Sequence, residues 1–223
     1  MASPAVPEVL PIFPLTGVLL LPGMWLPLHI FEPRYRHMVE DALQASMHIG
    51  MVQPRVPRED NRPLKGAEQE IPDVYPVGCV GRIDNCKREE DGRFLITLQG
   101  VQRFRIVEEL PLFRGYRRVR ADYGPFGADA ATAPQLDTAP LLLALQAYGQ
   151  ANRLPFDLNR LRGLSGAMLV NGLSMSLPFA PVEKQALLEA ADLETRYGVL
   201  SGLMAMGSKP SATDAEHAPP TVN

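Results

Sequence analysis

The stretch from residue 10 to residue 36 constrains the fold most, because it is too apolar for a surface loop and too rich in proline for a membrane-spanning helix. Prolines stand at positions 11, 14, 22, 27 and 33. Each one removes a backbone donor and fixes φ, so no run between them reaches the roughly 20 residues that a membrane helix needs. We therefore expect short strands interrupted at Thr16-Gly17 and Pro22-Gly23, and then a helix that begins at Pro33.

Bulk properties narrow the class of protein further. The 223 residues are 46% hydrophobic and carry a net charge of −3, which gives enough apolar material for a core and no general attraction to nucleic acid or anionic lipid. The first basic residue, Arg34, follows the apolar stretch, so a signal peptide is not expected. We expect a cytoplasmic protein without a membrane partner. Cys79 and Cys86 should be free thiols, because their spacing matches no zinc motif and, along an extended strand, places them too far apart for a disulfide.

Hydrophobic patterning predicts an α+β fold that begins with a mostly antiparallel sheet, closed or strongly coiled. Residues 33 to about 45 carry apolar side chains at helical spacing. Consecutive strands are joined by hairpins rather than by repeated crossover helices, which favours antiparallel pairing. Asp91-Gly92 is expected to form a hairpin turn and Gly100 to mark a bulge. Besides the opening strands, we expect strands at 47–53, 74–87, 93–107 and 116–123, and a surface excursion at 54–73.

The pattern changes from period 2 to period 3.6 after residue 124, where small and helix-breaking residues begin. Helices are expected at 136–152, at 158–173 as one or two, at 181–190, and after Asp192, which can cap the last one. The final residues have too few large apolar side chains to bury. We therefore place a first domain at 1–124, a linker at 125–135, a helical bundle at 136–206 and a disordered tail at 207–223.

Sequence motifs of catalysis are absent. No loop of the form G-x-x-x-x-G-K-[ST] occurs, and neither Ser165 nor Ser174 lies in G-x-S-x-G. The four histidines lack the i, i+4 spacing of a helical metal pair. We expect no enzyme, no catalytic residue, no metal and no cofactor. A hydrolase whose serine or cysteine meets a base only in the fold is left open.

A cluster of arginines is the strongest electrostatic feature. Arg103 and Arg105 alternate with Phe104 and are expected to project outward from one strand face, as nucleic-acid contacts would. The alternative is a solvated sheet face on which these side chains pair with Glu108 and Glu109, and the acidic net charge favours it. Six arginines and no lysine fall in this region: Arg103, Arg105, Arg114, Arg117, Arg118 and Arg120.

Three stretches of sequence together resemble a known family. They read Leu10-Pro-Ile-Phe-Pro-Leu with Leu-Leu-Leu-Pro-Gly-Met-Trp-Leu-Pro-Leu-His-Ile-Phe-Glu-Pro-Arg-Tyr-Arg36, then Gly78-Cys-Val-Gly-Arg-Ile-Asp84, then Leu95-Ile-Thr-Leu-Gln-Gly-Val-Gln-Arg-Phe-Arg-Ile106. The chain is similar to the N-terminal substrate-binding domain of Lon proteases, in the form of bacterial stand-alone Lon-domain proteins that lack the ATPase and peptidase domains. The resemblance implies a PUA-like β-barrel followed by helices, with no enzymatic activity of its own.

Two functions follow as expectations. The first is a non-enzymatic polypeptide-binding or adaptor module for unfolded or extended segments, with a protease or chaperone as a further partner. Trp25, Phe31 and Tyr35 are the residues proposed to receive such segments, in competition with a place in the core for each of them. The alternative is an RNA-binding module that uses the arginine-rich sheet face of a PUA-like barrel.

Overall fold

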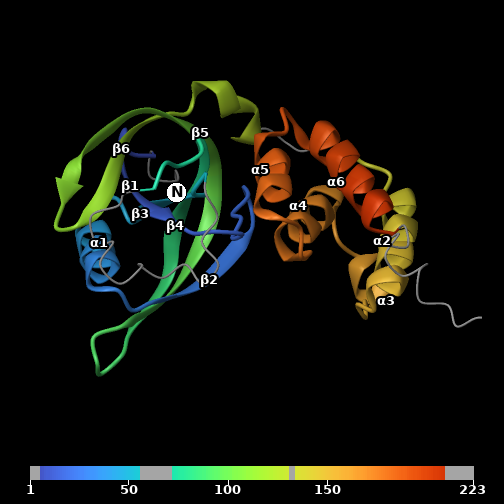
Figure 1. Cartoon of the computed structure of the whole chain (residues 1–223), viewed down its shortest axis with the longest axis horizontal. Coiled ribbons are helices and arrows are strands. Elements are labelled where there is room, and N and C mark those ends of the chain that lie inside the picture. The colour runs from blue at the N-terminus through green and yellow to red at the C-terminus, as the bar shows by residue number, and fades with distance from the viewer. Residues whose placement is uncertain (1–5, 56–71, 131–133, 209–223) are drawn as a thin grey trace, which may run out of the picture.

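The computed structural model of the chain describes residues 6–55, 72–130 and 134–208, and these form a strand-rich part and a helical part side by side (Figure 1). Most of the predicted surface excursion at 54–73 lies outside the described residues, as do residues 209–223 of the predicted tail. No helix in the described part of the chain is long and apolar enough to cross a membrane.

Six strands make up the first part. They are β1 (Val9–Pro14), β2 (Trp25–Ile30), β3 (His48–Val52), β4 (Val77–Arg88), β5 (Phe94–Phe113) and β6 (Tyr116–Asp122). Their order is β2-β5-β4-β3-β1-β6, and an additional pairing of β5 with β6 closes the sheet into a barrel. Every pair is antiparallel except β1 with β3. The predicted α+β fold with a mostly antiparallel barrel is therefore confirmed.

The predicted bulge lies at Gly100. The pairing of β4 with β5 shifts register between Val80 and Gly81, opposite Gln102 and Gly100. A Cβ at Gly100 would stand 2.1 Å from the carbonyl oxygen of Leu21, so only glycine fits this close approach of two backbones. Bulges strengthen the local twist of a strand, which helps the long β5 to pair with β2 near its start and with β6 near its end.

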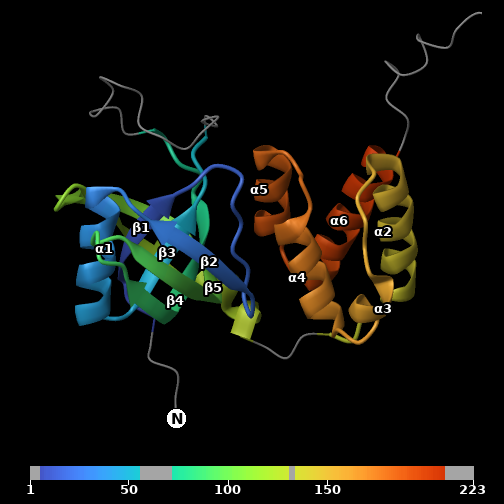
Figure 2. The same ribbon diagram turned by 90° about the horizontal axis from the view of Figure 1, so that it is seen from below.

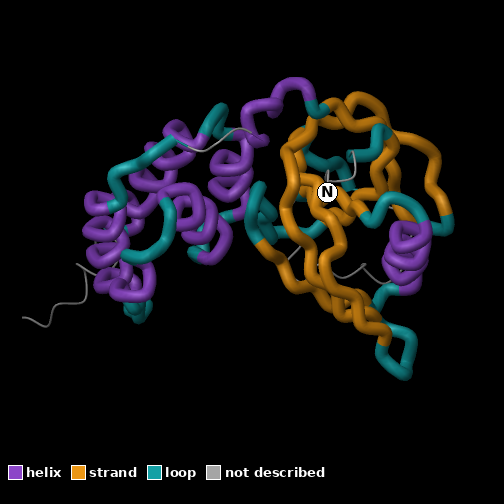
Figure 3. Tube along the Cα trace, turned by 180° about the vertical axis from the view of Figure 1, so that it is seen from behind, coloured by secondary structure: helices purple, strands orange, loops and turns teal. Residues whose placement is uncertain are grey.

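Helix α1 (Pro33–Gln44) packs beside the barrel, as Figure 3 shows from behind. It buries Tyr35, Met38, Val39 and Ala42, four of the positions that its periodicity predicted. The fifth, Leu43, is exposed. Glu32 precedes the helix, but its carboxylate accepts from Arg34 and makes no side-chain cap.

The second part is helical. It comprises the 3-10 helix η1 (Gly124–Ala130) and the helices α2 (Ala139–Asn152), α3 (Leu158–Leu161), α4 (Gly166–Ser176), α5 (Pro181–Glu189) and α6 (Leu193–Gly207). Helices α4 and α5 lie next to the barrel and α2 lies farthest from it (Figure 2). The linker predicted at 125–135 begins within η1, and residues 131–133 lie outside the described part. One hydrophobic cluster contains barrel residues such as Ile49 together with helical residues such as Leu187, so the two parts share a core.

Candidate functional site

Strand β2 is the end strand of the sheet order. It pairs with β5 along its whole length, from Trp25 opposite Gln99 to Ile30 opposite Phe94. Within the described residues, no other strand pairs with its second side. The strand therefore presents one open edge, where backbone N–H and C=O groups are available to another chain.

A bulge at the start of β2 decides which residues face that edge. Gly23, at φ +77°, donates to the Gly100 carbonyl at 2.9 Å, and the Gly100 N–H donates to the Met24 carbonyl at 2.8 Å. Met24 and Gly100 are thus a hydrogen-bonded pair, and bonded pairs alternate along an antiparallel ladder. The backbone groups of Leu26, Leu28 and Ile30 consequently point toward β5. Those of Trp25, Pro27 and His29 point toward the open edge.

Pro27 fits this geometry because its nitrogen, which has no hydrogen, faces the side where no ladder bond is needed. The edge then offers two N–H donors, from Trp25 and His29, and three carbonyl acceptors, from Trp25, Pro27 and His29. None of these groups has a backbone partner among the residues that the structure describes.

A mostly apolar pocket of about 230 Å³ lies beside β2, and its lining also includes Glu32. Residues 27–32 contribute to the lining, together with Phe13 near the end of β1 and Leu15 just after it. Tyr35 of α1 also lines the pocket, with its ring centroid 4.3 Å from that of Phe13 and the Arg34 guanidinium 4.5 Å above it. The pocket has room for about one large apolar side chain.

The three residues proposed to receive polypeptide have different surroundings. Trp25 is 49% exposed and Phe31 is 54% exposed, so both present aromatic surface on either end of β2. Tyr35 is 6% exposed and belongs to the core, where it can serve only as a wall of the pocket. His29 lies between the two exposed aromatics, and its ring bonds to Glu89 at 3.0 Å.

The expectation that Arg103 projects outward with Arg105 is wrong. Both side chains do leave the same face of β5, but η1 and the end of α5 cover that face at Arg103, which is 1% exposed. Its guanidinium meets Asp129 of η1 at 2.7 Å, and its Nη1 donates to the Leu188 carbonyl at 2.9 Å. It also donates to the carbonyls of Ala190 and Ala191.

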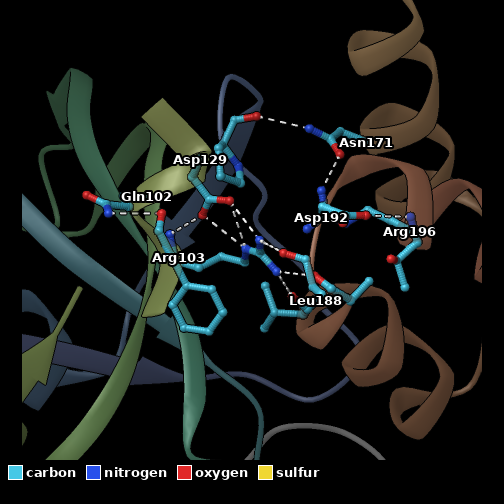
Figure 4. A network of polar contacts seen from close by, with 12 residues as sticks. Gln102, Arg103, Asp129, Asn171, Leu188, Asp192 and Arg196 are labelled. Atoms are coloured by element: carbon cyan, nitrogen blue, oxygen red, sulfur yellow. Dashed lines mark hydrogen bonds and ion pairs between the residues drawn. The ribbon is translucent and has the colours of Figure 1, made fainter. Parts of the chain in front are cut away.

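Figure 4 shows that Arg103 belongs to a polar network between the barrel and the helices. From the helical side, Arg196 donates to the Leu187 carbonyl at 2.8 Å and to Asn171 at 3.0 Å. Asn171 in turn donates to the Pro22 carbonyl of the barrel at 3.2 Å. Burial and the nearby Arg103 lower the pKa of Arg196 to about 10. Two guanidinium groups thus satisfy the carbonyls at the C-terminal end of α5, where positive charge is favoured.

The other arginines are also held mostly by neighbours within the chain. Arg117 is buried and bonds to Glu109 through two nitrogens, each at 2.7 Å. The remaining partners are Asp41 and Glu40 for Arg114, the Phe113 ring for Arg118, and Glu8 and Glu108 for Arg120. In the described part of the chain, Arg105 alone among the six is exposed without a carboxylate partner.

Comparison with known proteins decides the family. The family of ATP-dependent protease La (LON) substrate-binding domains matches residues 9–205. The chain belongs to this Lon substrate-binding domain family. The match is to a substrate-binding domain and not to a catalytic one.

Relatives of the Lon domain agree in sequence and fold. The chain is 28% identical to a Lon protease of Flavobacterium johnsoniae over 203 residues, which cover 88% of the chain and 24% of that protease. It is 37% identical to the Lon protease of Dictyoglomus thermophilum over 105 residues, 47% of the chain and 12% of the relative. The chain thus spans at most about a quarter of the length of these proteases.

Two solved structures share the fold. The Lon N-terminal domain protein from Xanthomonas campestris superimposes with a TM-score of 0.58 at 24% identity, over 88% of this chain and 97% of that one. The N-terminal domain of the Mycobacterium avium complex Lon protease gives a TM-score of 0.62 at 18% identity, over 89% and 98%. At these identities the likeness concerns the fold alone.

Ser165, Ser174 and the two cysteines of the Lon domain lie in structural positions. Ser174 is fully buried and donates to the Val170 carbonyl, while the Ser165 hydroxyl accepts from the Met168 N–H at the start of α4. Both cysteines are free thiols, as predicted, and burial raises the pKa of Cys79 far above its usual range. Among the described residues, no three histidine, cysteine or acidic side chains gather as a metal site.

The sequence predicts that aromatic residues near the proline-broken strands receive a segment by edge pairing or in a groove, but it does not identify which strand is the edge. Proline inside a strand pattern indicates an edge position, so Pro27 is the signal that points to β2. Phe13 and Leu15 were not predicted as pocket residues, because their apolar character marks them only as core candidates.

Proposed function

We propose that this Lon domain recognises polypeptides without catalysing a reaction of its own, and that unfolded or extended segments bind along the open edge of β2. The observation that carries the proposal is the open edge itself, with an apolar pocket beside it and exposed Trp25 and Phe31 at its two ends. Membership in a substrate-binding domain family supports it. Exposed aromatic side chains around a pocket are typical of polypeptide contacts.

The module would act as an adaptor that presents a bound segment to a protease or chaperone. The Lon proteases that the chain resembles carry about three quarters of their length beyond the matched part. The identity of such a partner and the cytoplasmic location expected from the sequence stay predictions.

RNA binding has less support. Arg103 and Arg117 are buried and ion-paired, and Arg114 and Arg120 contact carboxylates, so little of the arginine cluster is available to phosphate groups. Among the six arginines of the cluster, in the described part of the chain, only Arg105 is exposed without such a partner, and half-buried Arg118 contacts the Phe113 ring instead of a carboxylate. A sequence-independent phosphate contact normally requires several free cations on one face.

Binding to a permanently unfolded client tests the proposal. Fluorescein-labelled, reduced α-casein should bind the wild-type domain, and the variant with Trp25→Ser and Phe31→Ser together should bind at least about fivefold more weakly, because two exposed aromatic contacts are lost. Leu143→Ser is the matched control, since Leu143 is 68% exposed on α2, away from β2. Absence of casein binding, or equal losses in both variants, would contradict the proposal.

A further inference from the structure

The open edge of β2 also determines how a segment can bind. Resting on the polypeptide recognition argued above, we propose that the client is added as an antiparallel strand to β2, in a register set by Pro27, with one large apolar side chain in the pocket. The backbone groups that face the edge match this occupant, because an extended chain presents its own N–H and C=O groups at the same spacing of two residues.

Hydrogen bonding defines the backbone of the client. Client residues opposite Trp25 and His29 can each exchange two hydrogen bonds with the edge, since both positions offer an N–H and a carbonyl. The client residue opposite Pro27 can only donate, because Pro27 has no N–H. Three alternate client residues must therefore keep their N–H groups and cannot be proline.

Side-chain direction defines the rest of the client. Residues directly opposite one another in an antiparallel pair point to the same face of the sheet. The client residue opposite Leu28 consequently points to the inner side, toward the pocket walls formed by Phe13, Leu15 and Tyr35. Its neighbours on either side point outward, where Trp25, Pro27 and His29 are exposed. The substrate class is an extended segment with a large apolar residue between two residues that are not proline.

Pro27 limits the strength of this interaction. Proline on an edge strand is a common device against uncontrolled strand pairing, since it withholds one donor from any partner. Pro27 forms a pair with Thr97 that needs no ladder bond, so alanine can replace it without loss inside the sheet. The Pro27→Ala variant gains an N–H donor on the open side and should bind clients more tightly, by about two- to tenfold for one added hydrogen bond.

Backbone N-methylation provides the decisive test. The probe is a short fluorescein-labelled peptide with a single central phenylalanine flanked by threonine and lysine, followed by fluorescence anisotropy. N-methylation of either neighbour of the phenylalanine should weaken binding by about three- to tenfold or more, because a donor to the edge is lost. N-methylation of the phenylalanine itself should be tolerated, since its N–H points away from β2. The Pro27→Ala variant should bind the unmodified peptide more tightly, whereas Pro155→Ala, in the helical part, should not change binding.

The outcomes separate the binding mode from the function. A flat N-methyl scan on a peptide that binds overturns strand addition and leaves polypeptide recognition standing. The same conclusion follows if casein binds and this peptide does not. If neither casein nor the peptide binds, the proposed function itself fails. Unchanged affinity of a folded Pro27→Ala variant, checked by circular dichroism, also overturns the register.

Discussion

At the scale of single residues, Arg103 is the side chain that most clearly ties the barrel to the helices, because it contacts both η1 and the end of α5. Its replacement by methionine would leave Asp129, with a side chain only 8% exposed, as a buried charge without its partner, and would free carbonyls at the end of α5. We expect Arg103→Met to lower the free energy of unfolding by about 3–5 kcal/mol, measured by urea denaturation. Arg105→Met, two residues along the same strand and exposed, should stay within about 0.5 kcal/mol of wild type. Equal effects of the two variants would refute a structural role for Arg103.

His48 should make stability depend on pH. It is 1% exposed in β3, and burial lowers its pKa below the ordinary 6.5, helped by nearby Arg82 and opposed by a hydrogen bond that the ring donates to the Ser46 backbone. The unfolded chain then binds the proton more readily, so this contribution is complete above about pH 6.5 and is lost as pH falls toward the folded pKa. Between pH 7.5 and 5.5, the free energy of unfolding should fall more for wild type than for His48→Gln. Parallel curves would show that His48 does not contribute.

At the scale of elements, periodicity predicted where strands and helices lie but not what covers them. Helices α1 and α5 begin at Pro33 and Pro181, and α6 begins after its cap Asp192, as the sequence predicted. Strand β5 runs to Phe113, whereas the sequence predicted its end at 107. The prediction stopped short because the last residues of the strand show no alternation of apolar side chains, in keeping with their exposure. The alternation at Arg103 was read correctly, yet only the fold places η1 and α5 over that face.

The candidate site shows the same division. Its ingredients were visible in sequence as an apolar, proline-punctuated segment, and Trp25 and Phe31 were selected from it. Tyr35 was selected with them. Helical periodicity predicts that Tyr35 is buried, but it does not show that a pocket reaches the ring. Pro27 inside a strand pattern is a local signal for an edge strand, but the strand order that leaves β2 open depends on pairings between residues about 70 positions apart, which no local pattern specifies.

At the scale of the whole molecule, the barrel and the helices should unfold as one unit. They share a hydrophobic cluster, and Gln53 of the barrel side adds hydrogen bonds to Pro181 and Gln185 of α5. Trp25, the single tryptophan, reports on the barrel, whereas far-ultraviolet circular dichroism reports mainly on the helices. Because a buried polar network and a common core couple the two parts, we expect urea transitions followed by tryptophan fluorescence and by circular dichroism to coincide. Arg103→Met, which removes the central contact of Figure 4, should separate the two midpoints or broaden the transition. Distinct midpoints in the wild-type protein would mean that the parts are held together too weakly to present the β2 edge and the helices to a partner as one rigid body.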